Sequence, residues 1–133
     1  MVGTFYLHTQ TVEFLSIIAG LQVGFLATIL IAINNLRDSD TDVDANKKTL
    51  AVRFGDNFVR WEIAFLVAAI FGLNFMYGEK PFVNLSFLIL PVALIVLYSI
   101  WSIEDKRLLN KSLGMAALLQ MGFGILFSVG LVL

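Results

Sequence analysis

Apolar residues along this chain form long stretches separated by short polar segments. Three stretches carry no ionisable side chain, at residues 14–36, 81–103 and 112–133, and a fourth at 63–78 lengthens when its flanking aromatic residues are included. A hydrocarbon core of about 30 Å takes roughly 20 helical residues. The pattern therefore predicts an all-α, multi-pass transmembrane helix bundle with four spans, at about residues 12–36, 58–78, 82–103 and 112–133.

The composition excludes a water-soluble domain. Of the 133 residues, 59% are hydrophobic and 14% are charged, whereas ordinary soluble domains have about 25% charged residues. The first ten residues contain no basic residue and do not resemble a signal peptide. The sequence has no cysteine, so neither disulfide nor thiolate chemistry is involved.

Charge is concentrated in two connections between the spans. Eight of the nine Lys and Arg residues lie at 34–60 or 104–111, and Lys80 is the exception. Because Lys and Arg favour the cytoplasmic side, both connections are expected to face the cytoplasm. The 104–111 connection is expected to be a solvated turn whose basic residues only set the orientation.

Polar and small residues inside the spans are interpreted as packing features. Gln22 and Gln120 are expected to form interhelical hydrogen bonds, and Asn74 to bond locally. The tryptophans fall near the predicted interfaces, where aromatic belts occur. Glycines that would let helices approach closely are Gly20, Gly24, Gly122, Gly124 and Gly130.

The unusual chemistry lies in the polar segment at about 34–57, which follows the first span without a break. If the helix continues, Asn34, Asp38 and Asp42 stay within about 80° of one another on one face. Asp40 and Asp44 then point the other way, and with Asp56 are expected to be solvated.

Asp38 and Asp42 form the candidate metal site. Two carboxylates one helical turn apart repel each other and favour a bound cation. Hard oxygen ligands suit Mg²⁺, which usually bridges carboxylates to a phosphate group. The basic residues that follow, Lys47, Lys48 and Arg53, could share the remaining charge of a diphosphate.

A calcium-binding EF-hand is the competing interpretation of the acidic run that starts at Asp38. Its sixth position should be Gly and is Val43, and its twelfth should be Glu and is Thr49. The flanking helices are also membrane spans. This interpretation is set aside.

The same segment resembles a known family. The run Asn34-Asn35-Leu36-Arg37-Asp38-x-x-x-Asp42, followed by Lys47-Lys48-Thr49-Leu50-Ala51-Val52-Arg53-Phe54-Gly55, looks like the second aspartate-rich motif of the UbiA superfamily of intramembrane prenyltransferases. It is most similar to the branch that prenylates 1,4-dihydroxy-2-naphthoate. The segment Gly3-Thr4-Phe5-Tyr6-Leu7-His8-Thr9 is similar to the stretch before the sixth helix of that branch.

The resemblance implies a nine-helix fold in the bacterial inner (cytoplasmic) membrane, of which this chain would supply the carboxyl-terminal part. It implies transfer of a polyprenyl group from a polyprenyl diphosphate to 1,4-dihydroxy-2-naphthoate, with decarboxylation, giving demethylmenaquinone. The partners would be these two substrates, the lipid bilayer and a missing N-terminal half. Nucleic acid is not an expected partner.

The resemblance also implies a role for individual residues. Asp38 and Asp42 would be the catalytic metal ligands that hold Mg²⁺ against the diphosphate. Asn34 and Asn35 would line the cavity. The residues that would bind the diphosphate are Arg37, Lys47, Lys48 and Arg53.

Two departures from the family pattern limit the match. Family members commonly have Gly where this chain has Asn46, and Asn tolerates the left-handed conformation well. No segment supplies the first motif, of the form Asn-Asp-x-x-x-Asp, so the chain alone is expected to be inactive. The alternatives are a prenyltransferase for homogentisate or 4-hydroxybenzoate, and a non-catalytic four-helix membrane protein.

Overall fold

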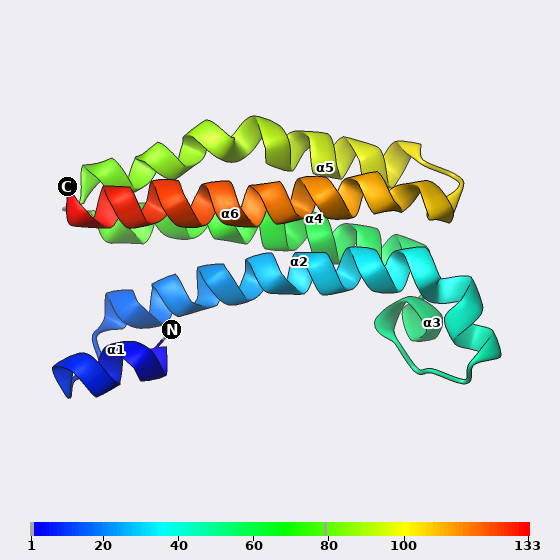
Figure 1. Cartoon of the computed structure of the whole chain (residues 1–133), viewed down its shortest axis with the longest axis horizontal. Helices are drawn as coiled ribbons and strands as arrows, with labels where there is room; N and C mark the ends of the chain where they lie inside the picture. Colours follow the sequence, from blue (N-terminus) through cyan, green and yellow to red (C-terminus); the bar gives the residue numbers. More distant parts are fainter. Residues whose placement is uncertain (1, 79) are drawn as a thin grey trace.

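The computed structural model describes residues 2–78 and 80–133, and this part contains helices and no strand (Figure 1). Four helical stretches are long and apolar enough to cross a membrane, at Phe14–Asp44, Asp56–Tyr77, Pro81–Ser102 and Lys106–Val132. The predicted all-α architecture with four spans is therefore confirmed. The elements in chain order are α1 (Val2–Thr9), α2 (Phe14–Asp44), α3 (Leu50–Phe54), α4 (Asp56–Gly72), η1 (Leu73–Tyr77), η2 (Pro81–Ile89), α5 (Leu90–Ser102), η3 (Lys106–Leu109) and α6 (Asn110–Val132).

The four long segments lie side by side as an antiparallel bundle. In Figure 1 the α2–α3–α4 connection and the α5–α6 connection lie at one end, and both chain termini lie at the other. Helix α2 packs against α4 and α6, while α6 also packs against η2 and α5. The two basic connections thus share one end of the bundle, called the polar end below.

The third span changes helix type partway along. Pro91 is near the start of α5 and has no N–H group, so the α-helical bond to the residue 87 carbonyl cannot form there. The preceding residues adopt the tighter 3-10 helix η2, whose last turn is closed by the Leu90 N–H donating to the Phe87 carbonyl oxygen. The span is therefore continuous but locally narrower.

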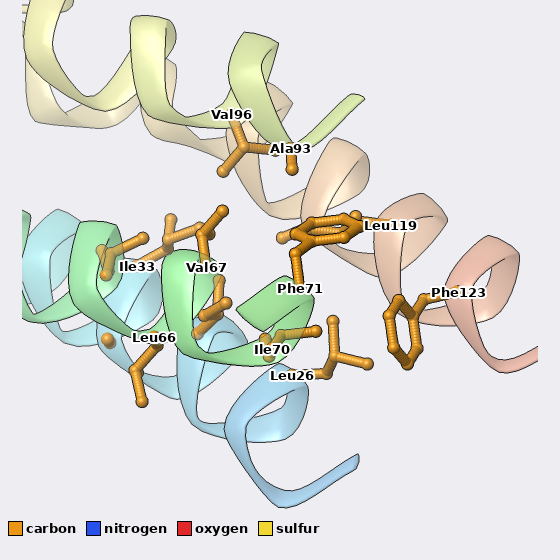
Figure 2. Close-up of a cluster of buried hydrophobic side chains, with 14 of the residues drawn as sticks. Leu26, Ile33, Leu66, Val67, Ile70, Phe71, Ala93, Val96, Leu119 and Phe123 are labelled. Carbon is orange, nitrogen blue, oxygen red and sulfur yellow. The ribbon is translucent and has the colours of Figure 1, made fainter. Parts of the chain in front are cut away.

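The core consists of apolar side chains that all four long segments direct into the bundle (Figure 2). Ile33 of α2, Val96 of α5 and Phe123 of α6 are fully buried. Lipid is as apolar as these side chains, so close packing contributes more here than exclusion of water. The labelled core residues are Leu26, Ile33, Leu66, Val67, Ile70, Phe71, Ala93, Val96, Leu119 and Phe123.

A buried polar network joins three segments in the half of the bundle away from the polar end. The Gln22 side-chain amide donates to the Ile70 carbonyl oxygen at 2.8 Å and to Asn74 Oδ1 at 2.9 Å. The Asn74 amide donates to Ser86 Oγ at 2.7 Å, and the Tyr77 hydroxyl donates to Gln22 Oε1 at 3.1 Å. The interhelical role predicted for Gln22 is confirmed. The local role predicted for Asn74 is wrong, because 3-10 helix η1 turns its side chain between α2 and η2.

Glycines of α6 allow η2 to approach closely. A Cβ atom at Gly130 would overlap the backbone of Phe82, and one at Gly122 would lie 2.7 Å from Ile89 Cδ1. Gly24 and Gly124 have nothing within 4 Å of the added atom. The packing interpretation therefore holds for Gly122 and Gly130 and does not hold for Gly24 and Gly124 in the described part of the chain.

We expect Gly130→Ala to destabilise the bundle by about 1–3 kcal/mol, the usual cost of overpacking, because backbone atoms of η2 must shift. The measurement is thermal unfolding of the detergent-solubilised chain. Gly124→Ala is the matched control, since its methyl group enters open space and Ala favours the helix. Equal melting temperatures for the two variants would contradict the close approach.

The two tryptophans of the chain contact each other. Trp61 of α4 and Trp101 of α5 form an edge-to-face pair with ring centroids 5.2 Å apart. Both rings are well exposed on the outside of the bundle. Trp61 lies near the start of α4 and Trp101 near the end of α5, so the pair lies toward the polar end.

Candidate functional site

Helix α2 continues past its apolar stretch and carries the aspartate motif. It extends unbroken to Asp44, so the predicted single face for Asn34, Asp38 and Asp42 has the helical backbone that it requires. The helix ends in a Schellman motif: the Lys47 N–H donates to the Asp42 carbonyl oxygen at 2.9 Å and the Asn46 N–H to that of Val43 at 3.0 Å.

Asn46 is the residue that makes this helix end possible. Its φ angle is 55°, in the left-handed region that most residues with a side chain avoid. Asn is among the few that adopt it readily, as expected for a position where family members commonly have Gly. The reversal at Asn46 turns Lys47 back toward the last turn of α2.

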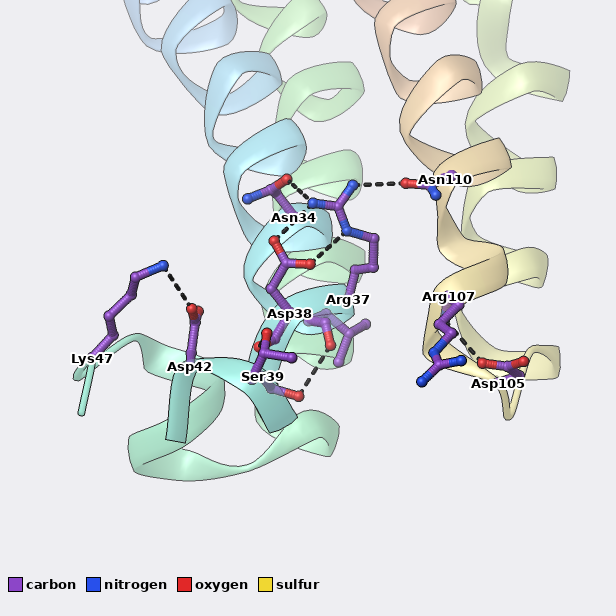
Figure 3. Close-up of polar contacts among 11 residues, drawn as sticks. Asn34, Arg37, Asp38, Ser39, Asp42, Lys47, Asp105, Arg107 and Asn110 are labelled. Atoms are coloured by element: carbon purple, nitrogen blue, oxygen red, sulfur yellow. Dashed lines mark hydrogen bonds and ion pairs between the residues drawn. The ribbon is translucent and has the colours of Figure 1, made fainter. Parts of the chain in front are cut away.

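Asp38 is held by Arg37 in a two-pronged ion pair (Figure 3). Arg37 Nε lies 2.7 Å from Asp38 Oδ1 and Arg37 Nη2 lies 2.7 Å from Asp38 Oδ2. The guanidinium also donates to Asn34 Oδ1 at 2.8 Å and to Asn110 Oδ1 of α6 at 2.7 Å. Arg37 thereby connects the motif face of α2 to the start of α6.

Asp42 is buried and pairs with Lys47. The Asp42 side chain is 6% exposed, and its Oδ1 lies 2.9 Å from Lys47 Nζ. The hydrogen bond to this carboxylate, with a smaller attraction from Asp38, raises the pKa of the Lys47 ammonium above its usual value. Lys47 therefore lies within the electrostatic field of both motif carboxylates.

The other predicted site residues are placed differently. Lys48 and Arg53 are exposed on the loop and on α3 respectively, and the described part of the chain shows no ion pair for either. Asn35 follows Asn34 by about 100° around the helix and lines a small cavity of about 60 Å³ between α2 and α4, together with Glu62. The structure thus brings together Asn34, Arg37, Asp38, Asp42 and Lys47, while Asn35, Lys48 and Arg53 lie apart from them.

Two aspartates expected to be merely solvated share a basic partner. Lys106 Nζ lies 2.7 Å from Asp40 Oδ1 and 2.8 Å from Asp56 Oδ2, although Asp40 itself is exposed. The solvated interpretation is therefore wrong for Asp56, whose side chain is 30% exposed, and incomplete for Asp40. Lys106 likewise does more than set orientation, because the α5–α6 connection folds against α2.

Two hollows lie along the seam between α2 and α6. The one at the polar end has a volume of about 430 Å³, and Arg37, Asp38, Arg107 and Asn110 line it with other charged residues. The second, of about 670 Å³, is lined mainly by apolar side chains that include Leu26 and Met121. Leu26 lies on the same face of α2 as Arg37 and about 16 Å along the helix axis from it. The seam thus has a hollow with four acidic and three basic side chains at the polar end, and an apolar hollow further along the bundle.

The motif carboxylates have the chemistry of magnesium ligands, and each is paired with a cation in the structure. Asp38 and Asp42 offer the hard carboxylate oxygens that Mg²⁺ prefers. No group of three or more Asp, Glu, His or Cys side chains is placed to hold a metal ion in the described ranges 2–78 and 80–133. A magnesium ion bound by these two carboxylates would need its other ligands from a substrate or from water.

Sequence reasoning missed Asn110 and Lys106. Both lie near the start of the last span, about seventy residues from their partners on α2. The sequence offered only a weak signal for their role. A Lys and an Asn come just before an apolar stretch, at the membrane surface where the motif also lies. Only the packing of α6 on α2 shows that they reach it.

Known proteins resemble this chain over nearly its whole length. A family model described as the UbiA prenyltransferase family matches residues 1–130. The chain belongs to this family. The "1,4-dihydroxy-2-naphthoate octaprenyltransferase" of Haemophilus influenzae is 31% identical over 135 residues, which cover 98% of this chain and 44% of that protein. No solved structure gives a significant match.

Two shorter matches have the same name. The Mycobacterium leprae protein is 37% identical over 60 residues, which cover 45% of this chain and 20% of that protein. The Escherichia coli protein is 35% identical over 71 residues, which cover 53% of this chain and 23% of that protein. The chain thus spans less than half the length of the curated relatives that it matches.

Proposed function

We propose that the chain is the carboxyl-terminal part of an enzyme that transfers a polyprenyl group from its diphosphate to 1,4-dihydroxy-2-naphthoate. The observation that carries the proposal is the pair Asp38 and Asp42 on the projecting end of α2, with a cation beside each carboxylate. The names of the relatives support this acceptor in preference to another aromatic ring.

The proposed reaction exchanges one bond at the donor for one at the acceptor. The allylic carbon–oxygen bond breaks, and the diphosphate leaves with the bonding electrons. The electron-rich ring then attacks the allylic carbocation at the carbon that carries the carboxylate. Carbon dioxide leaves, its bonding electrons return to the ring, and the product is the quinol form of demethylmenaquinone, which a separate two-electron oxidation converts to the quinone.

The residues of the chain contribute charge and an apolar wall. In the proposed site Asp38 and Asp42 hold Mg²⁺, which when bound neutralises negative charge on the diphosphate. Arg37 and Lys47 lie next to these carboxylates, so they can bind the departing oxygens, and Lys48 and Arg53 add positive charge from the loop and α3. The apolar hollow between α2 and α6 holds part of the isoprenoid and excludes water, which would convert the carbocation to an alcohol.

The proposal also includes a location in the membrane and an N-terminal half of the enzyme. The polar end of the bundle faces the cytoplasm in the bacterial inner membrane, because it carries eight of the nine basic residues. An N-terminal half with the first aspartate-rich motif completes the metal site. Five further helices would accompany that motif.

The test compares the chain alone with a fusion. In the fusion, the part of the Haemophilus influenzae relative that precedes the matched region is joined in frame to Met1. Each purified protein is incubated in detergent with Mg²⁺, octaprenyl diphosphate and labelled dihydroxynaphthoate. We expect the prenylated quinol, recovered as the quinone after oxidation in air, from the fusion and only background from the chain, because half of the metal ligands are absent from the chain.

Three results would contradict the proposal in different ways. Robust turnover by the chain alone would remove the requirement for a second half. A fusion that melts cooperatively but transfers nothing would favour a non-catalytic membrane protein. Preferential transfer to homogentisate or 4-hydroxybenzoate would change the acceptor. The control is the same fusion in excess chelator.

A further inference from the structure

Lys106 forms a four-residue cluster beside the last turns of α2, and it lines the same hollow as Arg37 and Asp38. Its ammonium donates to Ser39 Oγ and to Asp40 Oδ1, each at 2.7 Å, and lies 2.8 Å from Asp56 Oδ2. We call Lys106, Ser39, Asp40 and Asp56 the Lys106 cluster. It joins the last turns of α2, the first residue of α4 and the first residue of η3.

The cluster is built on a buried hydroxyl. Ser39 is 4% exposed. Its hydroxyl accepts from Lys106, and its hydrogen is shared between the Leu36 carbonyl oxygen at 3.1 Å and Asp56 Oδ1 at 3.2 Å. The Lys106 side chain is itself only 21% exposed. These contacts differ from a surface ion pair, whose partners are held loosely and contribute little.

The position of the cluster on the helix determines what it can control. Ser39 and Asp40 lie about 100° and 160° around the helix axis from Asp38, whereas Asp42 lies about 40° from it. A fixed contact at Ser39 and Asp40, in the same two turns as the motif carboxylates, limits rotation of the end of α2 about its own axis. That rotation decides where the Asp38 and Asp42 carboxylates point.

We propose that Lys106 is a positioning residue of the metal-binding motif, acting through Ser39, Asp40 and Asp56 to orient Asp38 and Asp42. The expected effect of Lys106 on turnover rests on the proposed function. Its expected effect on metal binding requires only that Asp38 and Asp42 bind the ion. Residues that orient metal ligands typically change metal affinity or activity 10- to 100-fold when replaced.

Simple electrostatics predicts the opposite sign, which makes the inference testable. Removing a lysine near a cation site removes repulsion, so charge alone would strengthen cation binding. Loss of orientation weakens it. Lys111 is the control, because it is an exposed lysine of α6, close to Lys106 in sequence, and forms no ion pair with the motif in the described part of the chain.

The experiment titrates Mn²⁺, as a paramagnetic substitute for Mg²⁺, into the purified fusion and follows bound ion by electron paramagnetic resonance. We expect Lys106→Met to weaken Mn²⁺ binding about 10-fold and Lys106→Arg to restore most of it. Lys111→Met should leave binding equal or slightly tighter. Asp40→Asn, which removes one exposed contact, should give a smaller loss than Lys106→Met.

Turnover and backbone exchange complete the test. Lys106→Met should raise the Mg²⁺ concentration for half-maximal prenyl transfer by about 10-fold and speed amide hydrogen exchange across 38–44. Unchanged or tighter Mn²⁺ binding in a folded Lys106→Met variant would overturn the positioning role. A fusion that binds Mn²⁺ in a Lys106-dependent way without transferring prenyl groups would overturn the proposed function and leave the positioning role standing.

Discussion

Asp42→Asn is expected to lower prenyl transfer by about 10²- to 10³-fold in the fusion, the range found when a charge-stabilising group is removed from an active site. Asn has nearly the same shape as Asp but lacks the negative charge that binds the metal ion and holds Lys47. The measurement is kcat for quinone formation at saturating Mg²⁺. Asp38→Asn is expected to fall in the same range.

A matched control separates this effect from charge and from folding. Asp44 lies two residues further along α2 and is exposed, so Asp44→Asn makes the same chemical change outside the motif face. It should retain wild-type kcat. The Asp42–Lys47 pair involves a lysine that is 66% exposed, so Asp42→Asn should shift the melting temperature little. Unchanged turnover in both Asp38→Asn and Asp42→Asn would remove the metal assignment.

Asn74→Leu is expected to be the most destabilising single substitution in the spans, by about 2–4 kcal/mol. It removes the acceptor of the Gln22 amide and the donor to Ser86 together. Individual hydrogen bonds between membrane helices contribute about 0.6 kcal/mol on average and up to about 1.7. The larger value expected here reflects the buried amide of Gln22, which loses one of its partners.

Asn84→Leu is the control for this second experiment. Asn84 is an exposed Asn of η2, so its replacement adds the same apolar side chain without breaking the network. The measurement is thermal unfolding of both variants in one detergent. A melting temperature for Asn74→Leu within a degree of that for Asn84→Leu would show that the network does not stabilise the bundle.

The architecture could be predicted from the sequence because each span is long and uninterrupted by charge. The shared face of Asn34, Asp38 and Asp42 was predicted only on the condition that the helix continues past its apolar stretch, and α2 does extend to Asp44. The tolerance of Asn46 for a left-handed backbone followed from its side chain alone, and its φ angle of 55° confirms it.

The parts of the site that depend on packing could not be predicted. A spacing of four residues places Asp38 with Asp42 but says nothing about which cation lies beside each. Arg37 is expected to bind a diphosphate, and its two-pronged pairing with Asp38 could not be read from the sequence. Lys106 reaches Ser39 only because the α5–α6 connection folds onto α2, a contact 67 residues apart in sequence. Gln120 was expected to bond between helices, but its Oε1 is buried without a partner in the described residues.

The contact between Trp61 and Trp101 gives this chain a built-in optical probe. Both tryptophans belong to that one pair, so all of the chain's tryptophan fluorescence originates at a single depth in the membrane, toward the polar end. Quenching by lipids brominated at known carbon positions would therefore report the depth of that end directly. The emission of an unlabelled protein can thus locate the bilayer surface relative to the aspartate motif.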